Sequence, residues 1–117
     1  ANYCDKECPS SDRNPLVDDG YADTAPVGSY PLGVGPYGAL DMAGNVAEWV
    51  ADWGSQTYYA NSPHENPLGP ISGSARVVRG GSWLGPAQSL RTSASFAADP
   101  AIATETFGFR CAMSASP

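Results

Sequence analysis

Residues 37–53, YGALDMAGNVAEWVADW, say more about the fold of this 117-residue chain than any other segment. Four large apolar residues recur in the segment at helical spacing: Val46, Trp49, Val50 and Trp53. Such spacing is typical of a helix that buries one face. We therefore predict a helix over residues 41–53, with Gly54 as its stop.

The rest of the composition is poor in residues that build aliphatic cores. Leu, Ile, Val and Phe together number 18, about 15% of the chain, whereas Gly, Pro and Ser make up about a third. These proportions are found in disordered or loop-dominated chains. Three Trp, six Tyr and a net charge of only −6 favour a folded chain. The composition excludes a helix bundle or coiled coil and predicts one loop-rich domain anchored by aromatic residues.

Outside the predicted helix, the sequence predicts little regular structure. Residues 76–79 (RVVR) and 108–112 (GFRCA) are each typical of a short strand. Residues 1–29 and 55–75 are polar and turn-rich, so we expect loops there. The Gly and Pro residues of segment 30–40 exclude an ordinary helix.

The charge balance limits the classes of partner. The chain has twelve acidic and six basic residues, and its single Lys is Lys6. This balance argues against binding to nucleic acid or to an anionic membrane surface. It is suited to binding cations.

Three motifs, in this order and spacing, resemble the formylglycine-generating, sulfatase-modifying family: residues 37–53, RVVRGGSW at 76–83 and GFRCA at 108–112. The resemblance implies an α+β fold, a loop-rich variant of the C-type lectin fold with low regular secondary structure. Full family domains are roughly twice this length, and the chain resembles their C-terminal half. Residues 1–117 are therefore expected to form a single domain, truncated or minimal at its N-terminus.

The family's enzymes carry two cysteines, five residues apart, that bind copper and oxidise a substrate cysteine. The matching positions here are Gly85 and Leu90. Neither residue can ligate Cu(I), so we expect no copper and no oxidase activity of the family's kind.

Asp41 and Glu48 are candidate metal ligands. On a continuous helix they would lie about 10 Å apart along the axis and could not share an ion. A non-helical turn at Gly44 would bring them together and free backbone carbonyls. The resemblance implies a Ca²⁺ site formed by the Asp41 and Glu48 side chains with the carbonyls of Gly44 and Val46. The alternative is that both acids only complement the dipole of a helix N-terminus.

The resemblance implies a second Ca²⁺ site near the N-terminus. Its ligands would be the side chains of Asn2 and Asp19 with the carbonyls of Tyr3 and Tyr21. From the residues alone, Asp18-Asp19-Gly20 indicates only a turn.

The cysteines leave several alternatives open. Cys4 and Cys8 form a disulfide, hold a metal with a third ligand, or remain free thiols; His64 is a poor third ligand. In some family members the thiol equivalent to Cys111 pairs with a cysteine of the N-terminal half. We expect Cys111 to be free and buried on the last strand.

The arginines and tryptophans of the motifs also have two interpretations. Arg79 and Arg110 would either hold an anionic ligand or, as we expect, clamp loop carbonyls or pair with Asp52 or Asp99. We expect the tryptophans to belong to the core rather than to a carbohydrate platform: Trp49, Trp53 and Trp83.

Residues 84–106 contain no evident acid, base or nucleophile for catalysis. We therefore predict a non-catalytic, Ca²⁺-stabilised binding module that presents this segment to a protein or a small ligand. A complementing N-terminal segment or a homo-oligomer is also expected. The predicted ligand-binding residues are Trp83, Leu84, Gly85, Gln88, Ser93, Ser95 and Phe96.

The variable proteins of diversity-generating retroelements resemble such a module, with a constant RGGSW and GFR frame around a variable stretch. Substitutions between sibling copies that are confined to residues 84–106 would support this hypothesis. One alternative is a fragment of an enzyme, either formylglycine-generating or a non-heme iron oxygenase that draws a His cluster from another domain. Another is a stability domain with no activity of its own.

Overall fold

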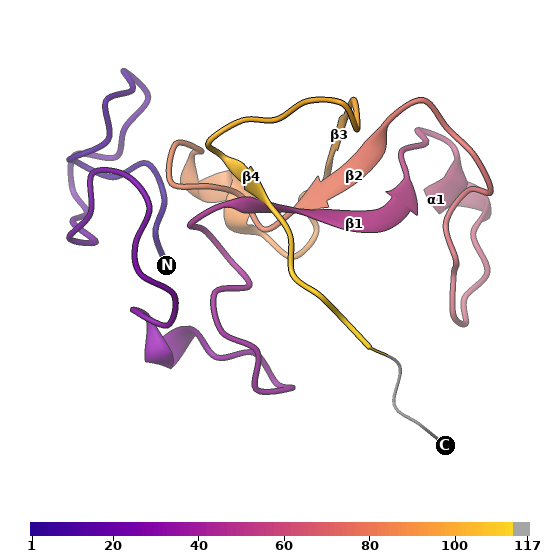
Figure 1. Cartoon of the computed structure of the whole chain (residues 1–117), viewed down its shortest axis with the longest axis horizontal. Helices are drawn as coiled ribbons and strands as arrows, with labels where there is room; N and C mark the ends of the chain where they lie inside the picture. Colours follow the sequence, from indigo (N-terminus) through magenta and orange to yellow (C-terminus); the bar gives the residue numbers. More distant parts are fainter. Residues whose placement is uncertain (114–117) are drawn as a thin grey trace.

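The computed structural model describes residues 1–113, and a four-stranded mixed sheet lies at its centre (Figure 1). The strands are β1 (Ala47–Trp53), β2 (Arg76–Arg79), β3 (Phe96–Ala98) and β4 (Phe107–Gly108), in the spatial order β3-β2-β1-β4. β2 is antiparallel to both β1 and β3, and β4 is parallel to β1. The predicted loop-rich α+β fold is confirmed.

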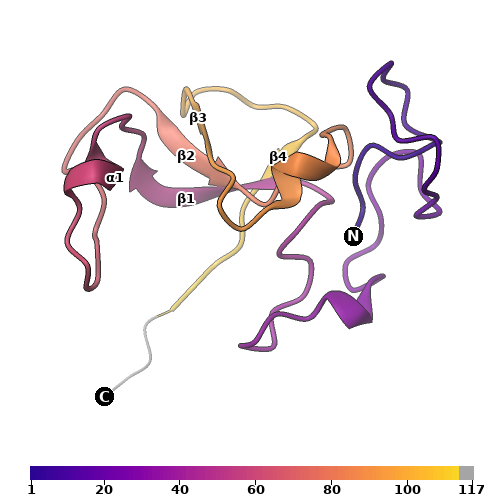
Figure 2. The ribbon, with the colours of Figure 1, turned by 180° about the vertical axis from the view of Figure 1, so that it is seen from behind.

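Helices are short and lie outside the sheet. They are the 3-10 turns η1 (Pro31–Gly33) and η2 (Ala87–Leu90) and the single turn α1 (Tyr58–Asn61). The N-terminal loops lie at one end of the sheet, and α1 with the loop that follows it lies at the other (Figures 1 and 2). No helix in the described part of the chain is long and apolar enough to span a membrane.

The helix predicted over residues 41–53 is wrong, because this segment is a tight turn followed by strand β1. Asp41, Gly44 and Asn45 have φ of 55°, 83° and 68°, which no right-handed helix accommodates. The apolar spacing has another cause. Trp49 packs edge to face on Phe107 of β4, with ring centroids 5.3 Å apart, and so belongs to a sheet face.

The other predicted elements agree more closely with the structure. The strand at 76–79 is confirmed as β2. The strand predicted at 108–112 is confirmed only at its start, because β4 spans Phe107–Gly108 and the chain then leaves the sheet as an extended trace (Figure 1). The expected loops at 1–29 contain no helix or strand, and residues 55–75 contain only α1.

The hydrophobic core of the described residues is small. Its buried members are Cys4, Cys8, Ala25, Ala47, Val78 and Trp83. The core prediction is thus confirmed for Trp83, whereas Trp49 and Trp53 are only half-buried. Trp53 instead packs against Arg76, whose guanidinium lies 3.6 Å from the ring centroid.

The molecule exposes more surface than a self-contained protein of its mass. Its accessible surface is 8391 Å², whereas a folded monomer of 12.1 kDa exposes about 6,000 Å². Its radius of gyration is 15.3 Å, compared with about 13 Å for a compact domain of this length. Large apolar side chains such as Leu32 and Ile71 are fully exposed.

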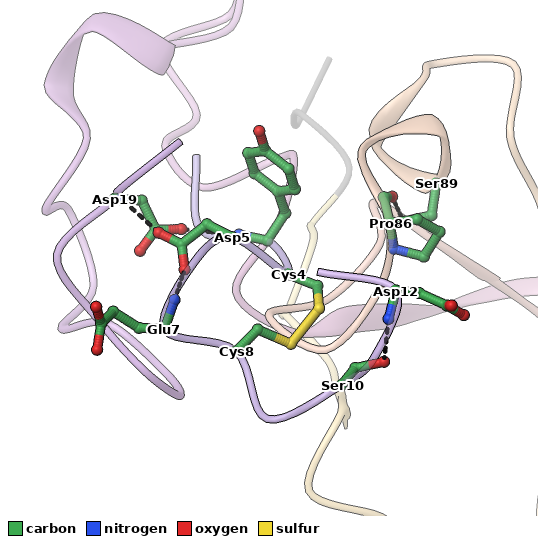
Figure 3. The surroundings of a disulfide bond; sticks show 10 residues. Cys4, Asp5, Glu7, Cys8, Ser10, Asp12, Asp19, Pro86 and Ser89 are labelled. Carbon is green, nitrogen blue, oxygen red and sulfur yellow. Dashed lines mark hydrogen bonds between the residues drawn. A yellow bond between two sulfur atoms is a disulfide. The ribbon is translucent and has the colours of Figure 1, made fainter. Parts of the chain in front are cut away.

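A disulfide joins Cys4 to Cys8, which settles the alternatives for this pair (Figure 3). Both residues are 2% exposed, and the backbone N–H of Cys4 donates to the Gly85 carbonyl at 3.0 Å. The disulfide closes a short N-terminal loop, and the hydrogen bond from Cys4 attaches this loop to the turn that follows β2. Cys111 is free, as expected, but it is exposed and lies beyond β4, so the prediction of burial was wrong.

Arg79 clamps a loop, as predicted. Its Nη1 donates to the Ala94 carbonyl at 2.8 Å and its Nη2 to the Thr92 carbonyl at 2.6 Å. These two hydrogen bonds hold the chain between η2 and β3 against β2. Charged hydrogen bonds of this kind substitute for apolar packing in a loop that has little of it.

We expect Arg79→Gln to lower the free energy of unfolding by about 1–3 kcal/mol, because two carbonyls lose a charged donor. Urea denaturation followed by Trp fluorescence measures the change. The matched control is Arg91→Gln, because Arg91 is an exposed arginine of the same loop. Equal effects of the two substitutions would contradict the clamp.

Candidate functional site

Several backbone segments approach one another closely at the turn before β1. The Gly44 N–H donates to the Gly80 carbonyl at 2.8 Å, and the Asn45 N–H donates to the Asn2 carbonyl at 2.7 Å. A side chain at position 44 would collide with the Asn2 backbone. Glycine is therefore required here both for its positive φ and for space.

This turn brings the four predicted ligands of the first Ca²⁺ site into one cavity. Asp41, Gly44, Val46 and Glu48 all line a cavity of about 270 Å³. Among the described residues, the carbonyl oxygens of Gly44 and Val46 accept no backbone hydrogen bond. The Asp41 Oδ2 accepts the Gly28 N–H at 2.7 Å. The four residues that the resemblance assigns to this site are therefore neighbours, and whether they bind Ca²⁺ stays a prediction.

Arg110 lines the same cavity and binds Glu48 through a bidentate ion pair. Its Nε and Nη2 donate to Oε2 and Oε1 of Glu48, each at 2.6 Å. Its Nη1 and Nη2 also donate to the carbonyls of Leu40 and Asp41, at 2.9 and 3.0 Å. The hydrogen bonds to Glu48 raise the pKa of Arg110 above its ordinary value, and the charges of Glu48 and Asp41 add to the shift. The expected clamping of carbonyls is confirmed, but the acidic partner is Glu48 and not Asp52 or Asp99.

The four predicted residues of the second site are also neighbours. The Asp19 carboxylate accepts the N–H of Tyr3 at 3.0 Å and the N–H of Tyr21 at 3.1 Å. Asn2 is 1% exposed, and its Nδ2 donates to the Asp23 carbonyl at 2.6 Å. Its Oδ1 is buried and has no hydrogen-bond partner. A buried oxygen without a donor is costly, and a cation beside it would remove that cost.

A buried carboxylate supports this site from the disulfide loop. Asp5 is 0% exposed and accepts the N–H groups of Glu7 at 2.9 Å and Asp19 at 2.5 Å (Figure 3). The hydroxyl of Tyr30 donates to the Asp19 carbonyl at 3.3 Å. Burial, together with the charge of Asp19, raises the pKa of Tyr30 to about 12. Tyr30 is therefore a neutral donor at physiological pH.

The candidate ligand atoms of both clusters are oxygens. Ca²⁺ is bound through oxygen atoms, whereas softer transition metals favour N or S ligands. Among the described residues, no three His, Cys, Asp or Glu side chains gather so that they could hold a metal ion. A metal at either cluster would depend on backbone and amide oxygens. The residues of both clusters fit Ca²⁺ if backbone and amide oxygens complete its coordination.

The predicted ligand-facing segment divides between two sides of β2. Gly85 and Phe96 line an apolar cavity of about 320 Å³ together with Val78. Ser95 and Phe96 line another cavity, of about 360 Å³, together with Val77. Because Val77 and Val78 are adjacent in a strand, they point to opposite faces of the sheet.

The other predicted ligand-binding residues line neither cavity. Trp83 is buried, and Leu84, Gln88 and Ser93 are exposed on the surface. Sequence reasoning missed most of the residues that line the apolar cavity at Gly85, among them Phe107 of β4 and Ser89 of η2. The adjacent valines of RVVR, which place one apolar side chain on each face of β2, are the signal that could have indicated a cavity on each side.

Comparisons with known proteins agree with these motifs. A family model described as a sulfatase-modifying factor enzyme 1-like domain, FGE-sulfatase, matches residues 1–115. The formylglycine-generating enzyme of Streptomyces coelicolor is 46% identical over 100 residues, covering 82% of this chain and 31% of that protein. Serine/threonine-protein kinase pkn1 of Chlamydia caviae is 45% identical over 93 residues, covering 78% of this chain and 15% of that protein. The hercynine oxygenase of Mycolicibacterium smegmatis is 43% identical over 65 residues, covering 50% of this chain and 15% of that protein.

Two solved structures share the fold. PvdO from Pseudomonas aeruginosa superposes with a TM-score of 0.68 at 33% identity, covering 79% of this chain and 34% of that one. Treponema denticola variable protein 1 superposes with a TM-score of 0.56 at 31% identity, covering 80% of this chain and 40% of that one. The chain spans less than a third of the length of the curated relatives named above. Its motifs, its fold and the family model together show that the chain belongs to the sulfatase-modifying factor enzyme 1-like, or FGE-sulfatase, domain family.

Proposed function

We propose that this chain is a Ca²⁺-stabilised binding module of the FGE-sulfatase family, without an oxidase activity of its own. The observation that carries the proposal is the apolar cavity at Gly85, the position that matches a copper-binding cysteine of the enzymes. None of its lining residues is titratable: Ala47, Val78, Gly81, Ser82, Gly85, Pro86, Ser89, Phe96, Ala97, Ala98 and Phe107.

The chemistry of this cavity is suited to binding rather than to proton transfer or electron transfer. Its only side-chain hydroxyls are those of Ser82 and Ser89, and the Ser89 hydroxyl donates to the Pro86 carbonyl at 2.7 Å. A Cβ added at Gly85 would lie 2.9 Å from the Ser89 Oγ, so a cysteine there would require Ser89 to move. A small apolar pocket with few polar groups accommodates an apolar side chain or small molecule.

The similarity to Treponema denticola variable protein 1 supports a display function for the segment around this cavity. Several predicted contact residues are exposed on that segment: Leu84, Gln88, Ser93, Ser95 and Phe96. A loop held by the Arg79 clamp tolerates changes in exposed residues, since its backbone is fixed by carbonyl contacts. This is the property that a variable binding surface requires.

The alternative proposal is that the chain is one part of a longer enzyme. The formylglycine-generating enzyme and the hercynine oxygenase among its relatives favour it. In that case the reactive groups would come from polypeptide outside these 117 residues. Bound iron or copper in the purified protein would distinguish this alternative from the binding module.

Ca²⁺ is proposed at both oxygen-rich clusters. Support at the N-terminal cluster comes from the buried Asn2 Oδ1, which has no donor. Support at the turn before β1 comes from the cavity that Asp41, Gly44, Val46 and Glu48 share. Ca²⁺ would tie together loops that a small apolar core does not hold.

A polypeptide partner is proposed from the excess accessible surface of roughly 2,400 Å². This area exceeds what one partner loses in a standard protein–protein interface, about 800 Å². β4 is an edge strand, and the exposed Phe109 and Met113 follow it. A complementing N-terminal segment of a longer chain, or a second copy, would cover such a surface.

Removal of Ca²⁺ by EGTA should lower the Tm by more than about 5 °C, because the ion binds only the folded state. Asn2→Ala should reduce this shift by removing the buried oxygen. Asn61→Ala serves as its control, because Asn61 lies in α1, outside both clusters. Differential scanning calorimetry measures the shift, and identical melting curves with and without EGTA would refute Ca²⁺ binding.

A cysteine peptide carrying the sulfatase motif should remain unconverted by this chain, even with added copper. Mass spectrometry detects the aldehyde product, and the enzyme from Streptomyces coelicolor serves as the positive control. Aldehyde formation would overturn the interpretation of Gly85 and Leu90. Elemental analysis of the protein as purified, before copper is added, should find calcium without iron or copper.

Light scattering of the isolated chain should give a mass above the 12.1 kDa of one copy, because the excess surface favours association. A single 12.1 kDa species that unfolds cooperatively would argue against a missing partner.

A further inference from the structure

We propose that Arg110 is a tethered cation that competes with Ca²⁺ for Glu48 and so sets the Ca²⁺ affinity of the turn before β1. The proposal rests on the proposed function, because it assumes that this turn binds Ca²⁺. It assigns to Arg110 a positioning role that the family motif alone does not contain.

Four oxygen atoms accept hydrogen bonds from the Arg110 guanidinium. Two are the carboxylate oxygens of Glu48, both at 2.6 Å, and two are the carbonyl oxygens of Leu40 and Asp41, at 2.9 and 3.0 Å. The guanidinium thus neutralises the carboxylate and ties Leu40 and Asp41 to β1. Arg110, which lies 62 residues after Glu48, thus connects Glu48 to the backbone of Leu40 and Asp41.

Arg110 shares the ion cavity without filling it. The cavity retains about 270 Å³, and its lining includes Arg110 together with all four predicted ligands. A carboxylate oxygen has lone pairs for more than one partner, so Glu48 can contact Arg110 and still face the cavity. A Ca²⁺ ion that enters would therefore lie beside a fixed positive charge.

This neighbouring charge lowers the gain from Ca²⁺ binding in two ways. Like charges repel, and the side chains of Arg110 and Glu48 are only 38% and 21% exposed, so water screens the repulsion incompletely. In addition, the guanidinium has already ordered the turn, so the ion gains less by ordering it. The N-terminal cluster differs, because its Asn2 Oδ1 has no donor at all. We therefore expect the N-terminal cluster to fill at lower Ca²⁺ concentration.

Isothermal titration with Ca²⁺ tests the competition on the whole chain and on four variants. Arg110→Gln removes the charge, whereas Arg110→Lys keeps the charge but loses the bidentate contact with Glu48. Glu48→Gln identifies which Ca²⁺-binding event belongs to the turn before β1. Arg79→Gln is the matched control, because Arg79 also clamps two loop carbonyls but contacts no proposed ligand.

The Glu48-dependent event should tighten about tenfold in Arg110→Gln, which corresponds to about 1.4 kcal/mol. The Tm of Arg110→Gln should fall in EGTA and recover with Ca²⁺ by a larger shift than in the unmodified chain. Arg110→Lys should lie between the two, with about threefold tightening. Arg79→Gln should lower the Tm but leave both Ca²⁺ affinities unchanged.

Three other outcomes would contradict either the competition or the proposed function. Weaker or unchanged Glu48-dependent binding in Arg110→Gln would overturn the competition and would mean that Arg110 only holds Glu48 in place. If Arg110→Gln does not fold even with Ca²⁺, unchanged affinity in Arg110→Lys would overturn it equally. If the unmodified chain and Arg110→Gln both bind no Ca²⁺, the proposed function fails first, and the titration of the unmodified chain alone shows this.

Discussion

The hydrogen bonds of Asn45 hold the separate segments of this molecule together. Its backbone N–H donates to the Asn2 carbonyl at 2.7 Å, and its carbonyl accepts the Trp83 N–H at 2.8 Å. Its side-chain amide pairs with both backbone groups of Ala25, at 2.9 and 3.2 Å. One residue thus joins the N-terminus, the loop at Ala25, the start of β1 and the turn after β2. Asparagine tolerates the positive φ of 68° that this arrangement requires.

Hydrogen bonds of this kind explain how a chain with so few aliphatic residues holds its loops. A chain with few aliphatic residues cannot gain enough from burial alone, so its loops depend on amide, carboxylate and guanidinium contacts to backbone groups. Arg79 holds the segment before β3, Arg110 holds the turn before β1, and Asp5 holds two N–H groups in the disulfide loop. Each of these polar contacts is directional, and so they fix loop geometry although the apolar core is small.

The sequence allowed the loop-rich fold, strand β2 and the neighbourhood of the proposed Ca²⁺ ligands to be predicted, but for different reasons. β2 follows from two adjacent β-branched residues, a local signal. The clustering of Asp41, Gly44, Val46 and Glu48 came from family resemblance, because their spacing alone also suited a helix N-terminus. The segment that became β1 was mistaken for a helix, since aromatic residues at positions 49 and 53 fit either period. The positive φ values at Asp41 and Asn45 exclude the helix, and in the sequence only the pair Gly44-Asn45 hints at them.

The pairing of Arg110 with Glu48 had no local signal, because it depends on β4 lying parallel to β1 with Glu48 opposite Gly108. That register places Arg110 two residues beyond Gly108 and within reach of the turn, so the sheet topology itself supplies a positive charge there. The N-terminal loops have the opposite imbalance, because they concentrate acidic residues and contain only Lys6 and Arg13 as basic ones. Lys6 is engaged with Asp18 at 2.7 Å on the surface. Within residues 1–113, neither the buried Asp5 nor the half-buried Asp19 forms an ion pair. The difference between the two clusters is therefore electrostatic in origin: the turn before β1 has a cationic side chain, Arg110, bound to its carboxylate Glu48, whereas the carboxylates of the N-terminal cluster are held by backbone N–H groups.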